Sequence, residues 1–245
     1  MPLFALSFVI QVALVLHIIK TGRNTTWIWI VVMLPGAGSV AYVILEVLPD
    51  LMGSRTARRA TRGVENIINP NKHINAAAQR YSITNTVENS LLLADQCVEK
   101  GMHSEAAELY RKALTGVHEH DPDILYRLAD TEFRLGNYAE TRRLLDLLIA
   151  KNPDYKNQEA HLLFAKTVDE LGDTAKAREE YAVLAGYYSG AEAKVRYATL
   201  LRRQGDAEQA DALLTEVLQT AKIAGRHFHT LNKEWITMAK RDLGR

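Results

Sequence analysis

Residues 87–114 read VENSLLLADQCVEKGMHSEAAELYRKAL, and a similar pattern recurs three more times before residue 219. Each of the four copies is centred on a glycine, at Gly101, Gly136, Gly172 and Gly205, so the spacings are 35, 36 and 33 residues. An alanine stands seven residues before each glycine, at positions 94, 129, 165 and 198. A period of about 35 residues, with small and bulky side chains at fixed offsets, is typical of a helical solenoid.

Each copy predicts two helices joined by a tight turn at the glycine. Glycine suits the end of the first helix because it adopts a left-handed conformation without steric cost. In the first copy, Ala106, Tyr110 and Ala113 follow the turn at spacings of three and four residues, which gives the second helix an apolar face. The small alanine before each glycine lets the two helices approach closely. We therefore expect an all-α fold.

The copies resemble the tetratricopeptide repeat family over residues 87–219. The resemblance rests on the large-then-small pair before each glycine, on the alanine of the second helix and on EAAELYRKAL at residues 105–114. Thr141 departs from the pattern, because it stands where the other copies have alanine. The resemblance implies a protein or peptide partner that lies in a concave groove lined by the first helices. The lysine and asparagine clamp of chaperone-binding members is absent at these positions.

Positions ten, six and three residues before each glycine are expected to face this groove, and Arg134 and Arg203 lie beside them. The candidate groove residues are Leu91, Asp95, Val98, Tyr126, Asp130, Phe133, Arg134, Leu162, Lys166 and Arg202. Along the chain these positions begin acidic and apolar and end basic. We therefore expect an extended peptide in which a basic stretch precedes an acidic one. The alternative is that these charges only solvate an exposed helix face.

Residues 226–243, RHFHTLNKEWITMAKRDL, predict one final amphipathic helix. Its apolar residues are expected to cover the last repeat, as the terminal cap of a solenoid must. These residues are Phe228, Leu231, Trp235, Ile236 and Ala239. The repeats and this cap are assigned to residues 86–245.

Residues 1–50 are apolar and predict a transmembrane helical hairpin. Residues 2–19 and 27–45 contain no charged side chain, and each run is long enough to cross a hydrocarbon core of about 30 Å. The two spans are placed at residues 2–19 and 27–48, with a polar turn between them. A signal peptide is the competing interpretation, but no positive side chain precedes the first run and no small-residue cleavage site follows it before Lys20.

This head resembles the two-helix N-terminal segment of bacterial cardiolipin synthases of the phospholipase D superfamily. His17, the polar turn, the aromatic residues that open the second run, LPGAG at residues 34–38 and Tyr42 carry the resemblance. In that family the segment is a membrane anchor, and catalytic His-x-Lys motifs lie downstream. No histidine of this chain has lysine two positions later, so synthase activity is not expected.

Residues 51–85 form a basic juxtamembrane linker, in which residues 72–83 predict a short helix that leads into the solenoid. By the positive-inside rule, Arg55, Arg58, Arg59 and Arg62 place both termini in the cytoplasm. The chain is therefore expected in the cell inner membrane as a multi-pass protein with cytoplasmic repeats. The same arginines are candidates for contact with anionic lipid, and a plain stop-transfer role is the alternative.

The sequence offers no motif for catalysis, a cofactor or a metal. It contains no phosphate-binding loop, nucleophile elbow, paired CxxC or dinucleotide fingerprint. The His-x-His pairs at residues 118–120 and 227–229 lack the further ligands that a zinc site needs. The single cysteine, Cys97, is expected in the solenoid core. Positive charge is not clustered in the repeats, so a nucleic-acid partner is not expected.

These features predict a non-enzymatic, membrane-tethered scaffold that binds a protein or peptide at the cytoplasmic face of a bacterial inner membrane. Two other hypotheses stay open. In one, the head and its arginines serve anionic phospholipid metabolism, and the solenoid regulates it. In the other, the topology is reversed and the chain is an assembly scaffold outside the membrane.

Overall fold

The computed structural model describes residues 2–22, 24–34, 36–47 and 71–244. The chain divides into two compact units, Met1–Lys72 and His73–Arg245, which we call the first and the second unit. Every regular element within the described ranges is a helix, in agreement with the expected all-α fold.

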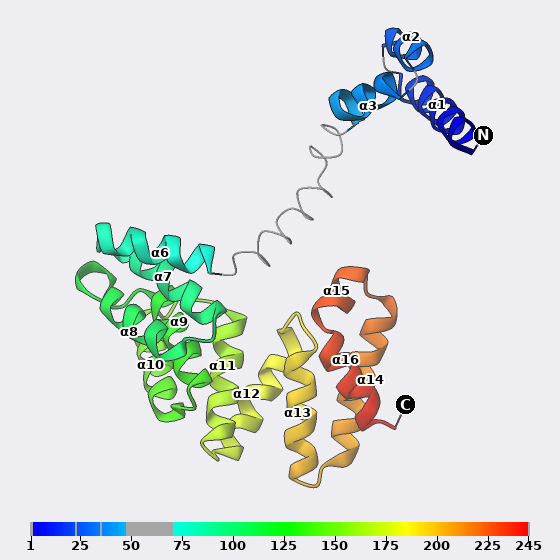
Figure 1. Cartoon of the computed structure of the whole chain (residues 1–245). Coiled ribbons are helices and arrows are strands. Elements are labelled where there is room, and N and C mark those ends of the chain that lie inside the picture. The colour runs from blue at the N-terminus through cyan, green and yellow to red at the C-terminus, as the bar shows by residue number, and fades with distance from the viewer. Residues whose placement is uncertain (1, 23, 35, 48–70, 245) are drawn as a thin grey trace. The chain divides into compact units, whose positions relative to one another are not determined.

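The second unit is a solenoid whose helices follow one another around an arc (Figure 1). Successive helices pack as the pairs α7–α8, α9–α10, α11–α12 and α13–α14. The short helix expected at residues 72–83 is present as α6. The helices are α6 (Lys72–Ile83), α7 (Val87–Glu99), α8 (His103–Ala113), η2 (Gly116–His118), α9 (Pro122–Arg134), α10 (Tyr138–Lys151), α11 (Gln158–Glu170), α12 (Thr174–Tyr187), α13 (Glu192–Arg203), α14 (Ala207–Ile223), α15 (Arg226–Leu231) and α16 (Lys233–Asp242).

The four repeat glycines end the first helices in the left-handed backbone region. Their φ angles are 74° at Gly101, 79° at Gly136, 82° at Gly172 and 86° at Gly205. A Cβ atom added at any of them would meet no other atom within 4 Å. The backbone conformation, and not a lack of space, therefore selects glycine at these turns.

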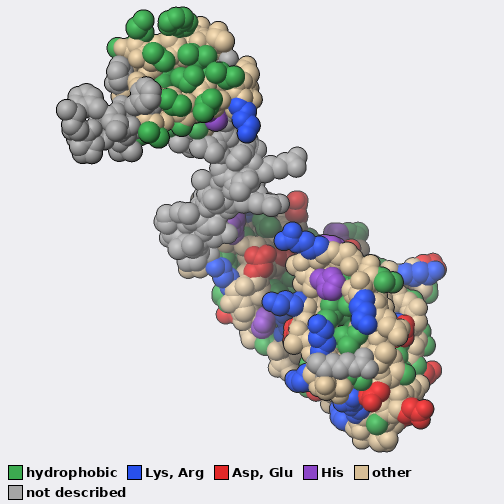
Figure 2. Space-filling view, turned by 90° about the vertical axis from the view of Figure 1, so that its right-hand side faces the viewer, with side chains coloured by type: hydrophobic (Ala, Val, Ile, Leu, Met, Phe, Trp, Pro, Cys, Tyr) green, Lys and Arg blue, Asp and Glu red, His purple; other side chains and the backbone are tan. Residues whose placement is uncertain are grey.

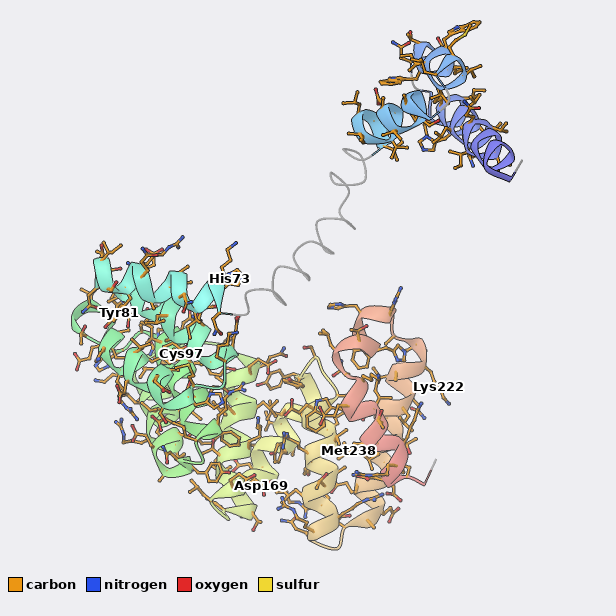
Figure 3. The ribbon with its side chains drawn as sticks, in the orientation of Figure 1. His73, Tyr81, Cys97, Asp169, Lys222 and Met238 are labelled. Carbon is orange, nitrogen blue, oxygen red and sulfur yellow. The ribbon has the colours of Figure 1, made fainter. Side chains whose placement is uncertain are left out.

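The fixed offsets around each glycine build the core. The alanines seven residues before the glycines are at most 1% exposed: Ala94, Ala129, Ala165 and Ala198. Thr141 is fully buried at the position where the other repeats have alanine. Its Oγ1 donates to the carbonyl oxygen of Asn137 at 3.1 Å, so the buried hydroxyl is hydrogen-bonded. Cys97 lies in this core as expected (Figure 3), and burial raises the pKa of its thiol.

The C-terminal tail forms two helices, α15 and α16, so the expected single helix is wrong. Asn232 lies between them and is 7% exposed. Its Oδ1 accepts from the backbone N–H of Ala191 at 2.7 Å, and its Nδ2 donates to the carbonyl oxygen of Phe228 at 3.0 Å. An asparagine side chain that bonds backbone groups competes with the helix, which explains the break.

The expected cap is present, although one of its proposed residues does not contribute. Helix α16 packs against α13 and α14, and it buries Ile236 and Ala239. Phe228 and Trp235 are partly buried against the core. Leu231 is 67% exposed and takes no part in the cap.

The first unit contains short helices in place of the expected second span. Its helices are α1 (Pro2–Thr21), α2 (Thr26–Met33), α3 (Ala37–Tyr42) and the π-helical η1 (Val43–Val47). Helix α2 has eight residues and is about 12 Å long. Gly36, directly before α3, has a φ of 87°, which no continuous helix adopts.

In the described part of the chain, no helix combines the length and the apolar character needed to cross a membrane. The expected transmembrane hairpin therefore gains no support, and the expected multi-pass inner-membrane localisation is contradicted. The membrane anchor implied by the resemblance to cardiolipin synthases gains no support, and neither does the membrane tethering that we expected. The candidate lipid-contacting arginines, Arg55, Arg58, Arg59 and Arg62, lie outside the described residues.

The first unit has a small core of its own. Ile18, Val31 and Tyr42 are fully buried together. The Nε1 of Trp27 donates to Glu46 Oε1 at 3.0 Å, which links α2 to η1. Figure 2 shows many hydrophobic side chains on the surface of this unit.

Candidate peptide-binding groove

The candidate groove residues lie on the first helices α7, α9, α11 and α13, and their accessibility differs along the solenoid. Leu91 and Tyr126 are half-buried. Leu162, at the same offset in the third repeat, is only 3% exposed and belongs to the core. Its side chain therefore offers little surface to a ligand, which corrects its place among the candidates.

The acidic start of the groove is neutralised by the chain itself. Both carboxylate oxygens of Asp95 accept from Arg127 Nη1, at 2.9 and 2.6 Å, and Tyr110 donates its hydroxyl to the same carboxylate at 2.5 Å. Burial and this carboxylate raise the pKa of the Tyr110 hydroxyl, which stays protonated. Val98 is half-buried against the core beside them. This end of the groove thus offers an apolar surface more than a free negative charge.

The centre of the groove gathers charged side chains from α9, α11 and α13. The ammonium group of Lys166 lies 4.8 Å from the centroid of the Phe133 ring. It is 3.9 Å from Glu192 Oε1, and the same oxygen accepts from Arg196 Nε at 2.7 Å. On α9, Arg134 Nε donates to Asp130 at 2.7 Å. We call these six residues the central cluster.

Lys166 has an unfavourable electrostatic environment within this cluster. Its side chain is 20% exposed. Burial lowers the pKa of Lys166, and the positive charge of Arg196 lowers it further, while Glu192 opposes the shift. Glu192, which Lys166 shares with Arg196, and Asp130 therefore compensate the charge of Lys166 only in part.

Two further tyrosines belong to this region, Tyr126 of α9 and Tyr188, which directly follows α12. Burial, with the carboxylates of Asp130 and Glu159 nearby, raises the pKa of Tyr126 to about 12. Tyr188 donates its hydroxyl to Glu159 at 3.1 Å. Both hydroxyls are protonated at neutral pH. Tyr188 already donates its one proton to Glu159, so Tyr126 is the tyrosine that can donate a further hydrogen bond.

The expected basic end of the groove is also paired within the chain. Arg203 donates to both carboxylate oxygens of Asp169, at 2.6 and 2.7 Å, which links α13 to α11. Figure 3 shows Asp169 toward the C-terminal end of α11. Arg202 forms an ion pair with Asp211 of α14, so its charge is paired within the fourth repeat.

Sequence reasoning missed two members of the central cluster, Glu192 and Arg196. They stand thirteen and nine residues before Gly205, at offsets outside the three that we assigned to the groove. The sequence could have identified them, because two residues four positions apart are separated by about one helical turn and therefore lie on one face of α13. Arg196 also stacks on the Trp235 ring of α16, with 4.9 Å to its centroid, so the cap helps to hold the cluster.

Within the described ranges, no group of three or more His, Cys, Asp or Glu side chains is arranged to hold a metal ion.

Comparisons with known proteins agree with this architecture. Residues 98–156 match the family model described as tetratricopeptide repeat. No curated protein matches the chain in sequence.

Several solved solenoids share the fold. A crystal structure of MamA has 20% identity and a TM-score of 0.53, and the match covers 61% of this chain and 86% of that one. MamA from Desulfovibrio magneticus RS-1 has 14% identity and a TM-score of 0.57 over 67% and 93% of the two chains. YrrB, described as a TPR protein with an unusual peptide-binding site, has 15% identity and a TM-score of 0.53 over 70% and 82%. The chain thus contains a segment that matches tetratricopeptide repeats in sequence, and its fold is that of these solenoids.

Proposed function

We propose that the chain is a protein–protein interaction module, and that its first helices bind an extended segment of a partner protein. The tetratricopeptide match and the fold shared with YrrB, which is described as having an unusual peptide-binding site, support this class of function. The observation that carries the proposal is the central cluster, where three first helices bring charged and aromatic side chains to one accessible face.

Lys166 is the member of the cluster that stability alone does not explain. A buried charge costs free energy unless it is paired and hydrogen-bonded, and Lys166 shares its nearest carboxylate with Arg196. Its lowered pKa is consistent with such a cost. Residues that reduce stability are common where a protein binds its ligand, because the ligand supplies the missing partner.

The charges of the cluster indicate what the partner segment carries there. Three cations, Arg134, Lys166 and Arg196, face two carboxylates, Asp130 and Glu192. An acidic side chain of the partner would restore the balance and would accept hydrogen bonds from Lys166 and Arg134.

The N-terminal part of the groove favours a different kind of side chain. Because Asp95 is already engaged by Arg127, the basic stretch that we expected in the ligand has less to bind. Leu91 and Val98 present apolar surface there. We therefore propose a segment with an apolar residue near α7 and an acidic residue near Lys166.

Affinity capture with the full chain tests this proposal. Proteins retained from a cell extract are compared between the wild type, Lys166→Glu and Arg143→Glu by mass spectrometry. Arg143 is the matched control, because its side chain is 62% exposed on the second helix α10 and its charge change is the same. We expect a set of proteins that is lost with Lys166→Glu and kept with Arg143→Glu. Equal retention by both variants would contradict the groove as the binding site.

A further inference from the structure

We infer that the solenoid has a second binding site, a pocket between α10, α11 and α12 that takes a bulky apolar side chain next to a carboxylate of a partner peptide. Its volume is about 800 Å³, a size typical of sites that bind small ligands or side-chain groups. This site is separate from the groove and does not rest on the function proposed for it.

The pocket lies on the other side of α11 from the groove. Its α11 residues include His161 and Phe164, whereas Glu159 and Lys166, which contact residues of the candidate groove, do not line it. An α-helix turns by about 100° per residue, so Glu159 and Lys166 lie roughly 140° to 160° around α11 from His161. A ligand in the groove therefore does not occupy the pocket.

Apolar side chains from two repeats form the base of the pocket. Leu145 and Leu148 come from α10 and Phe164 from α11, and they are 1%, 3% and 7% exposed. Ile149 stands at the edge and is 54% exposed. Such a surface favours an aromatic or branched aliphatic group.

One end of the pocket is a fixed polar network. His161 bonds Glu180 through Nε2 at 2.6 Å and the Tyr187 hydroxyl through Nδ1 at 2.5 Å. Lys176 Nζ is 2.8 Å from Glu180 Oε1. These contacts hold the four side chains in place, and they engage the only carboxylate that lines the pocket within the described residues.

Lys156, in the connection between α10 and α11, supplies the charge that a ligand would recognise. It lines the pocket and has no ion-pair partner among the residues that the structure describes. Lys176 is already paired with Glu179 and Glu180, so Lys156 is the lining cation that makes the pocket complementary to an anionic group beside the apolar one.

The other repeats do not repeat this arrangement. His161 stands eleven residues before Gly172, and the equivalent residues are Leu125 and Lys194 in the second and fourth repeats. Leu125 is 1% exposed in the core, and Lys194 forms an ion pair with Glu216 of α14. The pocket thus depends on residues particular to the third repeat.

The test uses the full chain and the tripeptide amide acetyl-Glu-Phe-Glu as the probe, titrated by NMR. The dissociation constant is measured for the wild type, Ile149→Glu, Lys156→Glu and the matched control Val183→Glu. Val183 is also 54% exposed and lies on α12, but it does not line the pocket. We expect a loss of about tenfold with Ile149→Glu and about threefold with Lys156→Glu, and no change with Val183→Glu.

Lys166→Glu separates this site from the groove, because we expect it to leave tripeptide binding unchanged. Equal binding by Ile149→Glu and Val183→Glu, or a loss confined to Lys166→Glu, would overturn the inference. Equal affinity for the lysine tripeptide acetyl-Lys-Phe-Lys amide would overturn its charge preference. Free 3-phenylpropanoate that binds more tightly than the tripeptide would assign the pocket to a small carboxylate and contradict the peptide as occupant.

Discussion

At the scale of single residues, Glu132 shows how one repeat is joined to the next. It is a carboxylate with none of its surface exposed. It stands four residues before Gly136, where the other repeats have the buried apolar residues Cys97, Val168 and Leu201. Arg111 of α8 pairs with one of its oxygens, and Asn137 Nδ2 donates to the other at 2.8 Å. A polar contact therefore takes the place of apolar packing between the first and second repeats.

Replacement of Arg111 by methionine is expected to lower the free energy of unfolding by about 2 kcal/mol, because it leaves a buried carboxylate without its cation. Urea denaturation measures the effect. The control Arg143→Met removes an exposed pair within one helix and should cost less than about 0.5 kcal/mol. Adding Glu132→Gln to Arg111→Met should restore part of the loss, and no recovery in the double variant would count against the buried charge as the cause.

Lys166 should reduce stability in a manner that depends on pH. Because the pKa of Lys166 is lowered below its ordinary 10.5 in the folded protein, the folded chain releases this proton at lower pH than the unfolded chain does. Between those two pKa values the unfolded chain binds more protons, so stability rises with pH. Lys166→Met is therefore expected to be more stable than the wild type at pH 7, by a margin that shrinks as the pH approaches 10.5. A margin that stays constant over this range would contradict the assignment.

At the scale of the helices, the turns and the tail follow different local rules. The turn glycines were predictable, because a left-handed residue after a helix selects glycine wherever the repeat places it. The break at Asn232 was not, because it depends on a hydrogen bond to Ala191, 41 residues earlier in the chain. A local amphipathic pattern carries no information about such a contact.

The two glycines near the ends of α12 should respond to alanine in opposite directions. Gly172 precedes the helix with a φ of 82°, and Gly186 lies within it at an ordinary helical φ. At both positions an added Cβ atom would meet no other atom within 4 Å, so the two sites differ only in their backbone conformation. Gly172→Ala should destabilise by about 1 kcal/mol and Gly186→Ala should stabilise by about 0.5 kcal/mol in thermal unfolding. Changes of the same sign would show that conformation does not decide these positions.

The junction of α15 and α16 gives a further prediction. Asn232→Ala should destabilise the chain by about 2 kcal/mol in urea, because it leaves the buried N–H of Ala191 without an acceptor. Thr237→Val is the control, since Thr237 donates to a backbone oxygen on an exposed face of α16 and its loss should change little. A small effect of Asn232→Ala would mean that the cap does not depend on this amide.

At the scale of the whole molecule, the sequence predicted the solenoid because one set of constraints recurs four times. The net charge of the candidate groove positions was not predictable, since the ion pairs Arg127–Asp95 and Arg203–Asp169 join residues 32 and 34 positions apart and offset the charges that the separate residues suggest. The prediction for residues 1–50 differed from the structure, because hydropathy shows residues 27–45 as one uninterrupted apolar segment. The helix in fact ends at Met33, and Gly36 takes a left-handed φ before the next one begins.

The most direct measurement of the central claim is a charge exchange between the groove and a partner found by capture. The dissociation constant is measured for the wild type and Lys166→Glu with the bound partner peptide, and again with each acidic residue of that peptide changed in turn to lysine. We predict that Lys166→Glu weakens binding at least about tenfold and that one lysine-substituted peptide restores most of the affinity. If Lys166→Glu binds the original peptide as tightly as the wild type does, the first helices are not the binding surface.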